Sequence, residues 1–326
     1  MVDLRRRQFI TLLGGAAVLP LAARAQQPDR MRRIGFLRAA PPPERELDAF
    51  LRALADRGYV QGRNFVLVPQ WGDGNVARLP ELAVALVNAA VDIIVAEGTI
   101  VARAAAAVTT TVPIVMVGAA DPFAGGFVKS LSHPGGNVTG FSSLDIDIAS
   151  KVFEILKEMV PGLKRIAVMA TRTIWTMFAP TQDQAAKVLG VELSYIDMPQ
   201  PEAAGAAMRQ AIAAGAQGAV VRGGPFFSAV QRRVIIDSAA ELRLPVIYER
   251  RDDAAQGGLV SYSADHVELY RTTAGYVARI LAGESAGELP VQQPTKFELV
   301  INLKTANALG LNIPASLLAR ADEVIE

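Results

Sequence analysis

Gly98 and Thr99 stand directly before an Ala-rich stretch that has the composition of a helix. A helix that begins here would present unpaired backbone N–H groups and the positive end of its dipole, which attract a carboxylate or a similar anion. The alternative is that Thr99 only caps its own helix. Together with Ile100, these residues form the first candidate binding element, and the chemistry they offer is anion binding rather than catalysis.

Other candidates follow short apolar runs that we expect to be strands, because ligands of open parallel sheets lie beyond the carboxyl ends of the strands. They are Arg38, Gly118, Asp121, Thr171, Trp175, Arg222, Gly223, Phe226 and Glu249. Asp121 could bind an ammonium group or cap a turn. Trp175 and Phe226 offer flat apolar faces to a ligand, although Trp175 could instead wedge a hinge and Phe226 could belong to the core. Glu249 and Arg250 could neutralise each other rather than a ligand.

Residue patterns typical of catalysis are missing from the sequence. The two histidines, His133 and His266, do not stand near carboxylates at metal-ligand spacing, and there is no nucleophile elbow, phosphate-binding loop or dinucleotide fingerprint. Cysteine is absent, which excludes disulfides, thiol catalysis and cysteine-bound metals. We therefore expect no catalytic residues, no metal and no cofactor, and we consider an enzyme the weaker interpretation.

The elements that must position these candidates occur twice in the chain. Residues 33–37 and 112–116 are apolar runs, and similar runs return 132 positions later at 165–169 and 244–248. Strand-like runs alternate with helix-like segments in both halves, which indicates mostly parallel sheets covered on both faces. We predict an α/β protein with two Rossmann-like lobes, each with a parallel sheet, joined by a multi-segment hinge and separated by a cleft.

At 326 residues the chain is long enough for two domain-sized cores. The part beyond about residue 258 has no counterpart upstream and is expected to return across the hinge. We assign residues 32–142 and about 258–288 to the first lobe, and residues 143–257 and about 289–326 to the second lobe.

The first 25 residues have the features of an export signal rather than of a folded segment. Arginines 5–7 precede an apolar stretch, and residues 23–25 have the small-x-small pattern after which a signal peptidase cuts, here after Ala25. Arg6 and Arg7 also fit a twin-arginine signal, and an ordinary secretory signal with an additional arginine is the alternative. Because no cysteine can carry a lipid, we expect a non-lipidated protein in the periplasm.

Loss of this leader removes four arginines and one aspartate, which changes the formal charge from +1 to −2. A mildly acidic body argues against nucleic-acid binding, which requires a basic face. No apolar run after residue 30 has the length of a membrane helix. The expected partner is therefore a small molecule, and we expect the protein to be a monomer.

Several motifs resemble the ABC transporter substrate-binding family that includes tryptophan- and tyrosine-binding proteins. They lie in the signal segment at 7–15 and 21–27, and at 133–140, 225–227, 257–262 and 289–305, so that the resemblance spans essentially the whole chain. The resemblance implies a type I periplasmic binding protein that closes on a small organic solute, such as an amino acid or an aromatic acid. It also implies a partner, an ABC permease with its ATPase in the inner membrane.

Two departures from the family pattern bear on the solute. Relatives often have Gly-Gly-Thr-Pro where residues 97–100 are Glu-Gly-Thr-Ile, and many have Ala-Asp-Pro-Phe-Phe where residues 223–227 are Gly-Gly-Pro-Phe-Phe. The acid that would face the cleft is missing and Arg222 stands nearby, so an anionic or plain aromatic acid becomes an alternative to an amino acid. The same clamp could instead present its ligand to a signalling receptor, and an exported α/β enzyme is the less favoured alternative.

Overall fold

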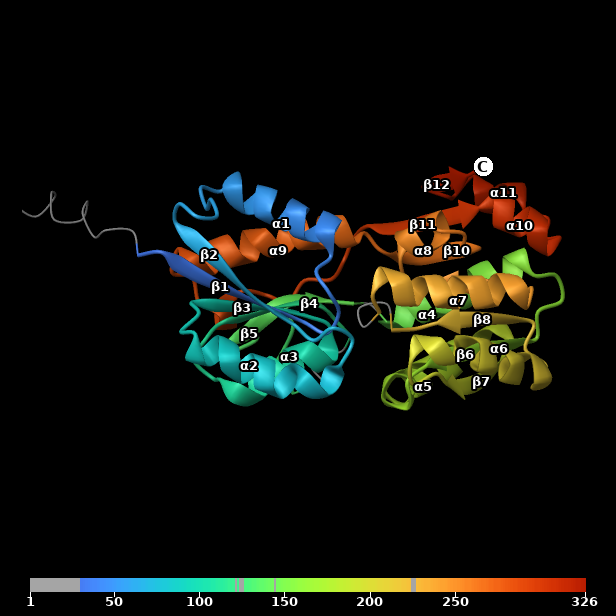
Figure 1. Cartoon of the computed structure of the whole chain (residues 1–326), viewed down its shortest axis with the longest axis horizontal. Helices are drawn as coiled ribbons and strands as arrows, with labels where there is room; N and C mark the ends of the chain where they lie inside the picture. Colours follow the sequence, from blue (N-terminus) through green and yellow to red (C-terminus); the bar gives the residue numbers. More distant parts are fainter. Residues whose placement is uncertain (1–29, 121, 123–125, 144, 224–226) are drawn as a thin grey trace, which may run out of the picture.

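The computed structural model describes residues 30–326, except residues 121, 123–125, 144 and 224–226. The described chain forms two lobes, each a sheet between two layers of helices (Figure 1). The predicted export signal lies outside the described residues. Within the described ranges, no helix combines the length and the apolar composition that crossing a membrane requires.

The first lobe is built on five parallel strands in the order β2-β1-β3-β4-β5. They are β1 (Arg32–Arg38), β2 (Phe65–Trp71), β3 (Ile93–Glu97), β4 (Ile114–Ala119) and β5 (Val138–Ser142). One face of the sheet packs against α1 (Glu44–Ala55) and α9 (His266–Leu281), and the other against α2 (Leu79–Asn88) and α3 (Thr99–Val108). Because helices cover both faces, the central strand β3 is buried along its whole length.

The second lobe contains a seven-stranded sheet in the order β12-β11-β10-β9-β8-β6-β7. Its strands are β6 (Arg165–Ala170), β7 (Glu192–Asp197), β8 (Gly218–Val221), β9 (Val246–Tyr248), β10 (Val260–Ala264), β11 (Phe297–Asn302) and β12 (Glu323–Ile325). β11 runs antiparallel to β10, so this sheet is mixed but mostly parallel, in agreement with the prediction.

Two layers of helices cover the second sheet. One layer is α4 (Asp145–Met159), α5 (Arg172–Leu189), α10 (Leu303–Leu309) and α11 (Ala315–Leu318), and the other is α6 (Ala204–Ala213) and α7 (Ala229–Glu241). The short helix α8 (Arg251–Ala255) connects β9 to β10. Single 3-10 turns are η1 (Val76–Arg78), η2 (Pro201–Ala203) and η4 (Ala286–Glu288).

Local sequence signals set the ends of several helices. Ser228 and Gln231 form a capping box that satisfies backbone groups at the start of α7. Gly190 ends α5 in the left-handed region, with a φ of 66° that favours glycine. Such local signals explain why helices of the expected length alternate with the strands.

The predicted duplication is confirmed by the strand pairing. β1 pairs with β2 on one side and β3 on the other, and β6 pairs in the same way with β7 and β8. The carboxyl ends of β1, β3 and β4 in the first sheet and of β6, β8 and β9 in the second therefore carry equivalent loops. The predicted α/β fold of two Rossmann-like lobes is confirmed.

Along the described chain, the lobes are connected after β5, after β10 and before β11. The second connection differs from the predicted one near residue 258, because β10 pairs with β9 and β11 and stays in the second sheet. The chain leaves that sheet only at α9, which packs beside α1 in the first lobe (Figure 1). The third connection, which returns the chain to the second lobe, also comes later than the predicted position near residue 289. Leu289 and Val291 still belong to the cores of the first lobe.

Candidate functional site

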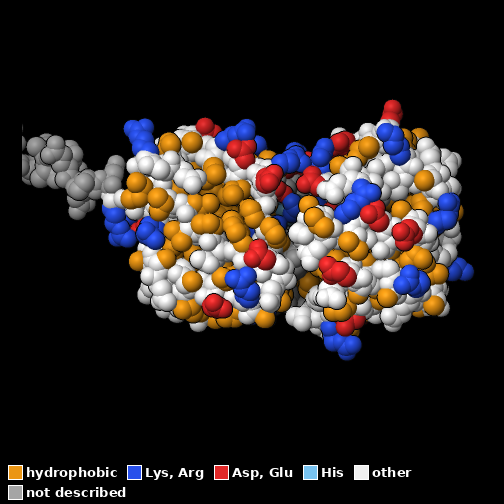
Figure 2. All heavy atoms as spheres, in the orientation of Figure 1, with side chains coloured by type: hydrophobic (Ala, Val, Ile, Leu, Met, Phe, Trp, Pro, Cys, Tyr) orange, Lys and Arg blue, Asp and Glu red, His pale blue; other side chains and the backbone are white. Residues whose placement is uncertain are grey.

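A cavity of about 980 Å³, part of which is open to solvent, lies where the two lobes meet. Its walls come from the carboxyl ends of strands in both sheets, where open parallel sheets bind their ligands, and from the segments that cross between the lobes. Most of its lining is apolar and includes Ile100, Ala120, Ile148, Ile174, Phe178, Tyr262, Leu269 and Pro294. This mainly apolar lining with a few polar groups is that of a site for a small organic molecule. Figure 2 shows charged side chains gathered at the junction of the lobes.

The first-lobe wall contains the first turn of α3. Gly98 is the N-cap residue and has a φ of 87°, a backbone conformation that favours glycine and allows the sharp turn from β3 into the helix. Because Gly98 has no side chain, it cannot cap the first N–H groups of α3. The Thr99 hydroxyl instead accepts a hydrogen bond from the Ala120 N–H at 2.7 Å, so the alternative that Thr99 caps its own helix is wrong. This turn retains the anion-attracting character of a helix N-terminus.

The second-lobe wall contains an ion pair between residues that follow β8 and β9. Arg222 Nε lies 2.9 Å from Glu249 Oε1, and Glu249 Oε2 accepts a hydrogen bond from the Gly223 N–H at 2.9 Å. The Arg222 guanidinium also lies over the ring of Phe178, 5.0 Å from its centroid. Glu249 is therefore neutralised by Arg222, and the alternative that it pairs with Arg250 is wrong.

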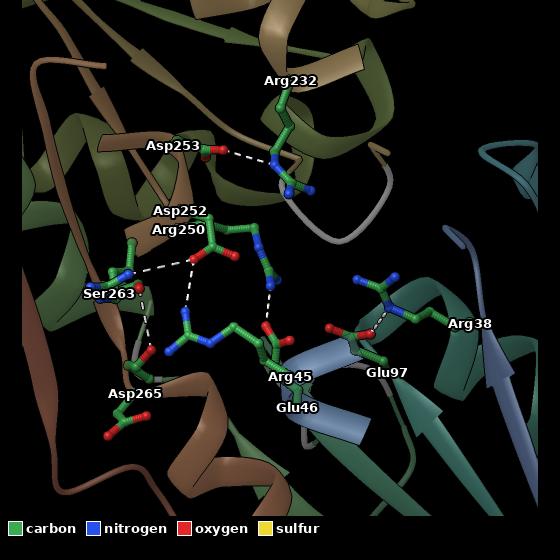
Figure 3. Close-up of polar contacts among 12 residues, drawn as sticks. Arg38, Arg45, Glu46, Glu97, Arg232, Arg250, Asp252, Asp253, Ser263 and Asp265 are labelled. Carbon is green, nitrogen blue, oxygen red and sulfur yellow. Dashed lines mark hydrogen bonds and ion pairs between the residues drawn. The ribbon is translucent and has the colours of Figure 1, made fainter. Parts of the chain in front are cut away.

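Arg250 reaches from the second lobe into the first, where it is bound to Glu46 of α1 (Figure 3). Beside it, Arg38 at the end of β1 is bound to Glu97 at the end of β3. Each of these four residues is at most 6% exposed. The Arg250–Glu46 pair spans the two lobes. Each of its buried charges is therefore compensated only when the lobes are in contact, so the pair couples the energy of the site to the arrangement of the lobes.

A second, more exposed ion pair also joins α1 to the second lobe. Arg45 Nη1 of α1 lies 2.9 Å from Asp252 Oδ1 of α8, and the two side chains are 56% and 31% exposed. Solvent screening makes such a pair worth little compared with a buried one. The two pairs lie in the same region of Figure 3 and differ chiefly in burial, which makes them a matched set for testing contacts between the lobes.

The buried charges shift the titration of their neighbours. Burial alone would raise the pKa of Glu97, but the guanidinium groups of Arg38 and Arg250 outweigh it, so the pKa lies below its usual value. For His266 at the start of α9, burial and then the positive charge of Arg250 lower the pKa of the imidazole. Glu97 is thus ionised and His266 neutral near pH 7.

Seven of the residues predicted from the sequence line the cavity: Gly98, Thr99, Ile100, Gly118, Arg222, Gly223 and Glu249. Asp121 and Phe226 lie outside the described residues. The expectation that ligands bind beyond the carboxyl ends of parallel strands therefore identified residues that are more than one hundred positions apart in the sequence but line one cavity.

The structure places the remaining candidates away from the cavity lining. Arg38 is occupied by its buried pair with Glu97. Thr171 is the N-cap residue of α5. Trp175 stacks on Tyr195, with ring centroids 5.3 Å apart, and packs against the core of the second lobe. Trp175 is therefore part of the lobe's packing and does not offer its face to the cavity.

Sequence reasoning missed residues that come from α5 and from the crossing segments. Ile174 and Phe178 line the cavity from one face of α5, at the i,i+4 spacing that could have identified them. Ser263 comes from the end of β10, His266 from the start of α9, and Ser143 from the connection after β5. The sequence pattern predicted this strand in the first lobe, so it did not predict that the carboxyl end of β10 lines the cavity.

The described part of the chain contains no cluster of three or more histidine, aspartate and glutamate side chains that could hold a metal ion. What the described lining offers is an apolar enclosure, a helix N-terminus and arginine side chains. This combination can bind an organic acid.

Two lobes of this topology, with a cavity of small-molecule size at the strand ends between them, define the type I periplasmic binding protein fold. Residues 41–325 match the family described as "ABC transporter substrate binding protein". The chain belongs to this family, which confirms the resemblance of its motifs.

Individual relatives agree with this assignment. The chain is 28% identical over 274 residues to the tyrosine-binding protein of Clostridioides difficile (strain R20291), an alignment that covers 83% of this chain and 78% of the relative. It is 28% identical to a conserved domain protein of Vibrio cholerae O1 biovar eltor str. N16961, with a TM-score of 0.83 over 90% of this chain and 100% of that one. An ABC domain from Streptococcus pneumonia in complex with L-Trp is 24% identical, with a TM-score of 0.82 over 90% and 100%, and shows the fold alone.

Proposed function

We propose that the protein is the periplasmic solute-binding component of an ABC importer. It captures a small organic solute between its lobes and delivers it to a permease and its ATPase in the inner membrane. The observation that carries this proposal is the cavity, which is formed by the strand ends of both sheets and combines a mainly apolar lining with the N-terminus of α3.

The proposed solute is a carboxylate with an aromatic or aliphatic body. The first turn of α3, from Gly98 to Ile100, attracts the carboxylate, and Ile174 and Phe178 on the opposite wall enclose the apolar part. One relative is named for tyrosine and another was solved with L-Trp. Aromatic amino acids and aromatic acids without an ammonium group are therefore the first solutes to test.

Closure is proposed to occur by a hinge motion at the three connections between the lobes. A solute that contacts α3 of the first lobe and α5 of the second binds the closed arrangement more tightly than the open one. Its binding therefore shifts the population toward closure. The closed form is then the one that the permease recognises.

In this proposal, the chain is exported, cleaved after Ala25 without lipidation, and acts as a monomer that releases its solute unchanged. Support for binding without catalysis comes from Glu249. This carboxylate lines the cavity, and its two oxygens are engaged by Arg222 and by the Gly223 N–H rather than directed at a solute.

A thermal-shift screen of the mature chain tests the proposal, with L-tryptophan, L-tyrosine and small aromatic and aliphatic carboxylates as probes. A solute present at 100 times its Kd should stabilise the protein by about 2.7 kcal/mol. Thr99→Asp should abolish the shift, because it puts a negative charge at the start of α3 while keeping an acceptor for the Ala120 N–H. The control Thr110→Asp alters an exposed residue just beyond the other end of α3 and should keep the shift.

Two results would count against the proposal. Unchanged affinity in the Thr99→Asp variant would remove α3 from the site. Conversion of any bound probe to a product would show that the protein is an enzyme.

A further inference from the structure

Arg250 has more hydrogen-bond donors than its surroundings accept. The residue is 5% exposed, and its Nη2 donates to Glu46. Within the described part of the chain, its Nε and Nη1 are buried and have no hydrogen-bond acceptor. Arg250 also lines the cavity between the lobes, so a guanidinium with two unsatisfied donor atoms lies in the wall of the proposed solute site.

Buried donors without an acceptor are rare and destabilising in folded proteins. The neighbouring carboxylates are already engaged, since Glu97 is bound to Arg38 and Glu249 to Arg222. His266, on the same wall, could accept a hydrogen bond through its unprotonated ring nitrogen, but it does not accept one from Arg250 Nε or Nη1. An acceptor for the open N–H groups of Arg250 must then come from outside these residues.

Two sources of an acceptor are available next to Arg250. One is a solute in the cavity between the lobes. The other is water in a smaller polar cavity of about 610 Å³, which shares Arg250, Ser263 and His266 with the first. The first cavity is mainly apolar, so an acidic group placed there has few competing partners, and a charge-assisted hydrogen bond to a guanidinium is strong in such surroundings.

We propose that Arg250 determines specificity by donating hydrogen bonds to an acidic group of the solute. This inference rests on the proposed function. It adds that the cavity between the lobes selects a molecule that carries an anionic group and is otherwise apolar. Arg250 belongs to the second lobe, and its guanidinium is held by Glu46 of the first lobe. The guanidinium is therefore positioned to bind the acidic group only when the lobes meet. Recognition of the acid and closure are thereby coupled.

The test compares acids with their neutral amides. Kd is measured by calorimetry for indole-3-acetate against indole-3-acetamide, and for L-tryptophan against L-tryptophanamide, with the mature wild-type chain and three variants. The wild type should prefer the acid of each pair. Arg250→Gln should lower the ratio of acid to amide affinity about 10- to 100-fold, the range of a hydrogen bond to a charged group.

Arg250→Lys and Glu46→Gln separate specificity from folding and closure. Arg250→Lys keeps the positive charge and should restore part of the preference for the acid. Glu46→Gln removes the charge of the partner in the other lobe but keeps an amide oxygen that can still accept a hydrogen bond from Arg250, so it should weaken acid and amide by the same factor and leave their ratio unchanged. Thermal melting of each variant shows whether it is folded.

The outcomes are distinguishable. An Arg250→Gln variant that melts normally and keeps the wild-type ratio overturns this inference, and water then satisfies the Arg250 donors. A wild type that binds the amides as well as the acids also overturns it, while the proposed solute-binding function stands. Failure of all four probes to bind or stabilise the wild type overturns the proposed ligand class and this inference with it.

Discussion

Replacement of Glu46 by glutamine should weaken solute binding strongly, although Glu46 does not line the cavity between the lobes. The carboxylate of Glu46, which is 6% exposed, holds Arg250, which is 5% exposed and belongs to the other lobe. Glutamine keeps the size of the side chain and removes its charge. The substitution therefore leaves a buried arginine without its ionic partner whenever the lobes meet.

The magnitude follows from the burial of the pair. Breaking a buried ion pair by removing one partner costs about 3–5 kcal/mol. Glu97 lies close enough to interact with Arg250 and compensates part of the loss, so we expect the lower end of this range. Because the pair spans the lobes, the cost falls on the closed arrangement and not on the folding of either lobe. A cost of about 3 kcal/mol then raises the Kd of a solute that binds the closed form roughly 100-fold.

Calorimetric titration with the strongest probe of the thermal-shift screen measures this effect. Arg45→Gln is the matched control, because it breaks the exposed contact between α1 and α8 that involves Asp252. A pair of this kind contributes about 0.2–1 kcal/mol, which corresponds to less than about a sixfold change in Kd. An unchanged Kd in Glu46→Gln, or equal effects in both variants, would refute the reasoning that the buried pair stabilises the closed arrangement.

Two further predictions concern residues behind the cavity. The pKa of Glu97 lies below its usual value, so its contribution to stability should be complete above about pH 4.5 and should be lost as the pH falls through its lowered pKa in the folded protein. Melting temperatures measured between about pH 5 and pH 3 should therefore fall less steeply in Glu97→Gln than in the wild type, and parallel curves would exclude this role. Trp175→Ala should lower the melting temperature, because it removes a ring that stacks on Tyr195 and packs against the core, but should change the Kd less than about twofold. A large loss of affinity at constant stability would place Trp175 in the site instead.

The sequence predicted those parts of the site that depend on one strand and the turn after it. Gly98, Gly118 and Arg222 line the cavity because each follows a buried apolar run, and such runs can be recognised locally. The duplication at an offset of 132 residues predicted two lobes of the same plan with a cleft between them. These inferences needed no knowledge of how the lobes are oriented.

Features that depend on the orientation of the lobes could not be predicted. Arg250 and Glu46 are 204 positions apart, and nothing near either residue indicates the other. His266 and Ser263 line the cavity because β10 belongs to the second sheet and the chain crosses to the first lobe only after it. In that sheet, β10 pairs with the antiparallel strand β11, which comes later in the sequence. Trp175 was predicted to offer its face to a ligand, but Tyr195 on the neighbouring strand β7 covers it.

The most direct test of the account is a crystal structure of the mature chain grown with the acid that gives the largest thermal shift. The account predicts density for this acid in the cavity between the lobes, with its apolar body against Ile174 and Phe178 and an acidic oxygen within hydrogen-bond distance of Arg250. Density for the acid elsewhere on the protein, or an acidic group beyond hydrogen-bond distance of Arg250, would contradict it.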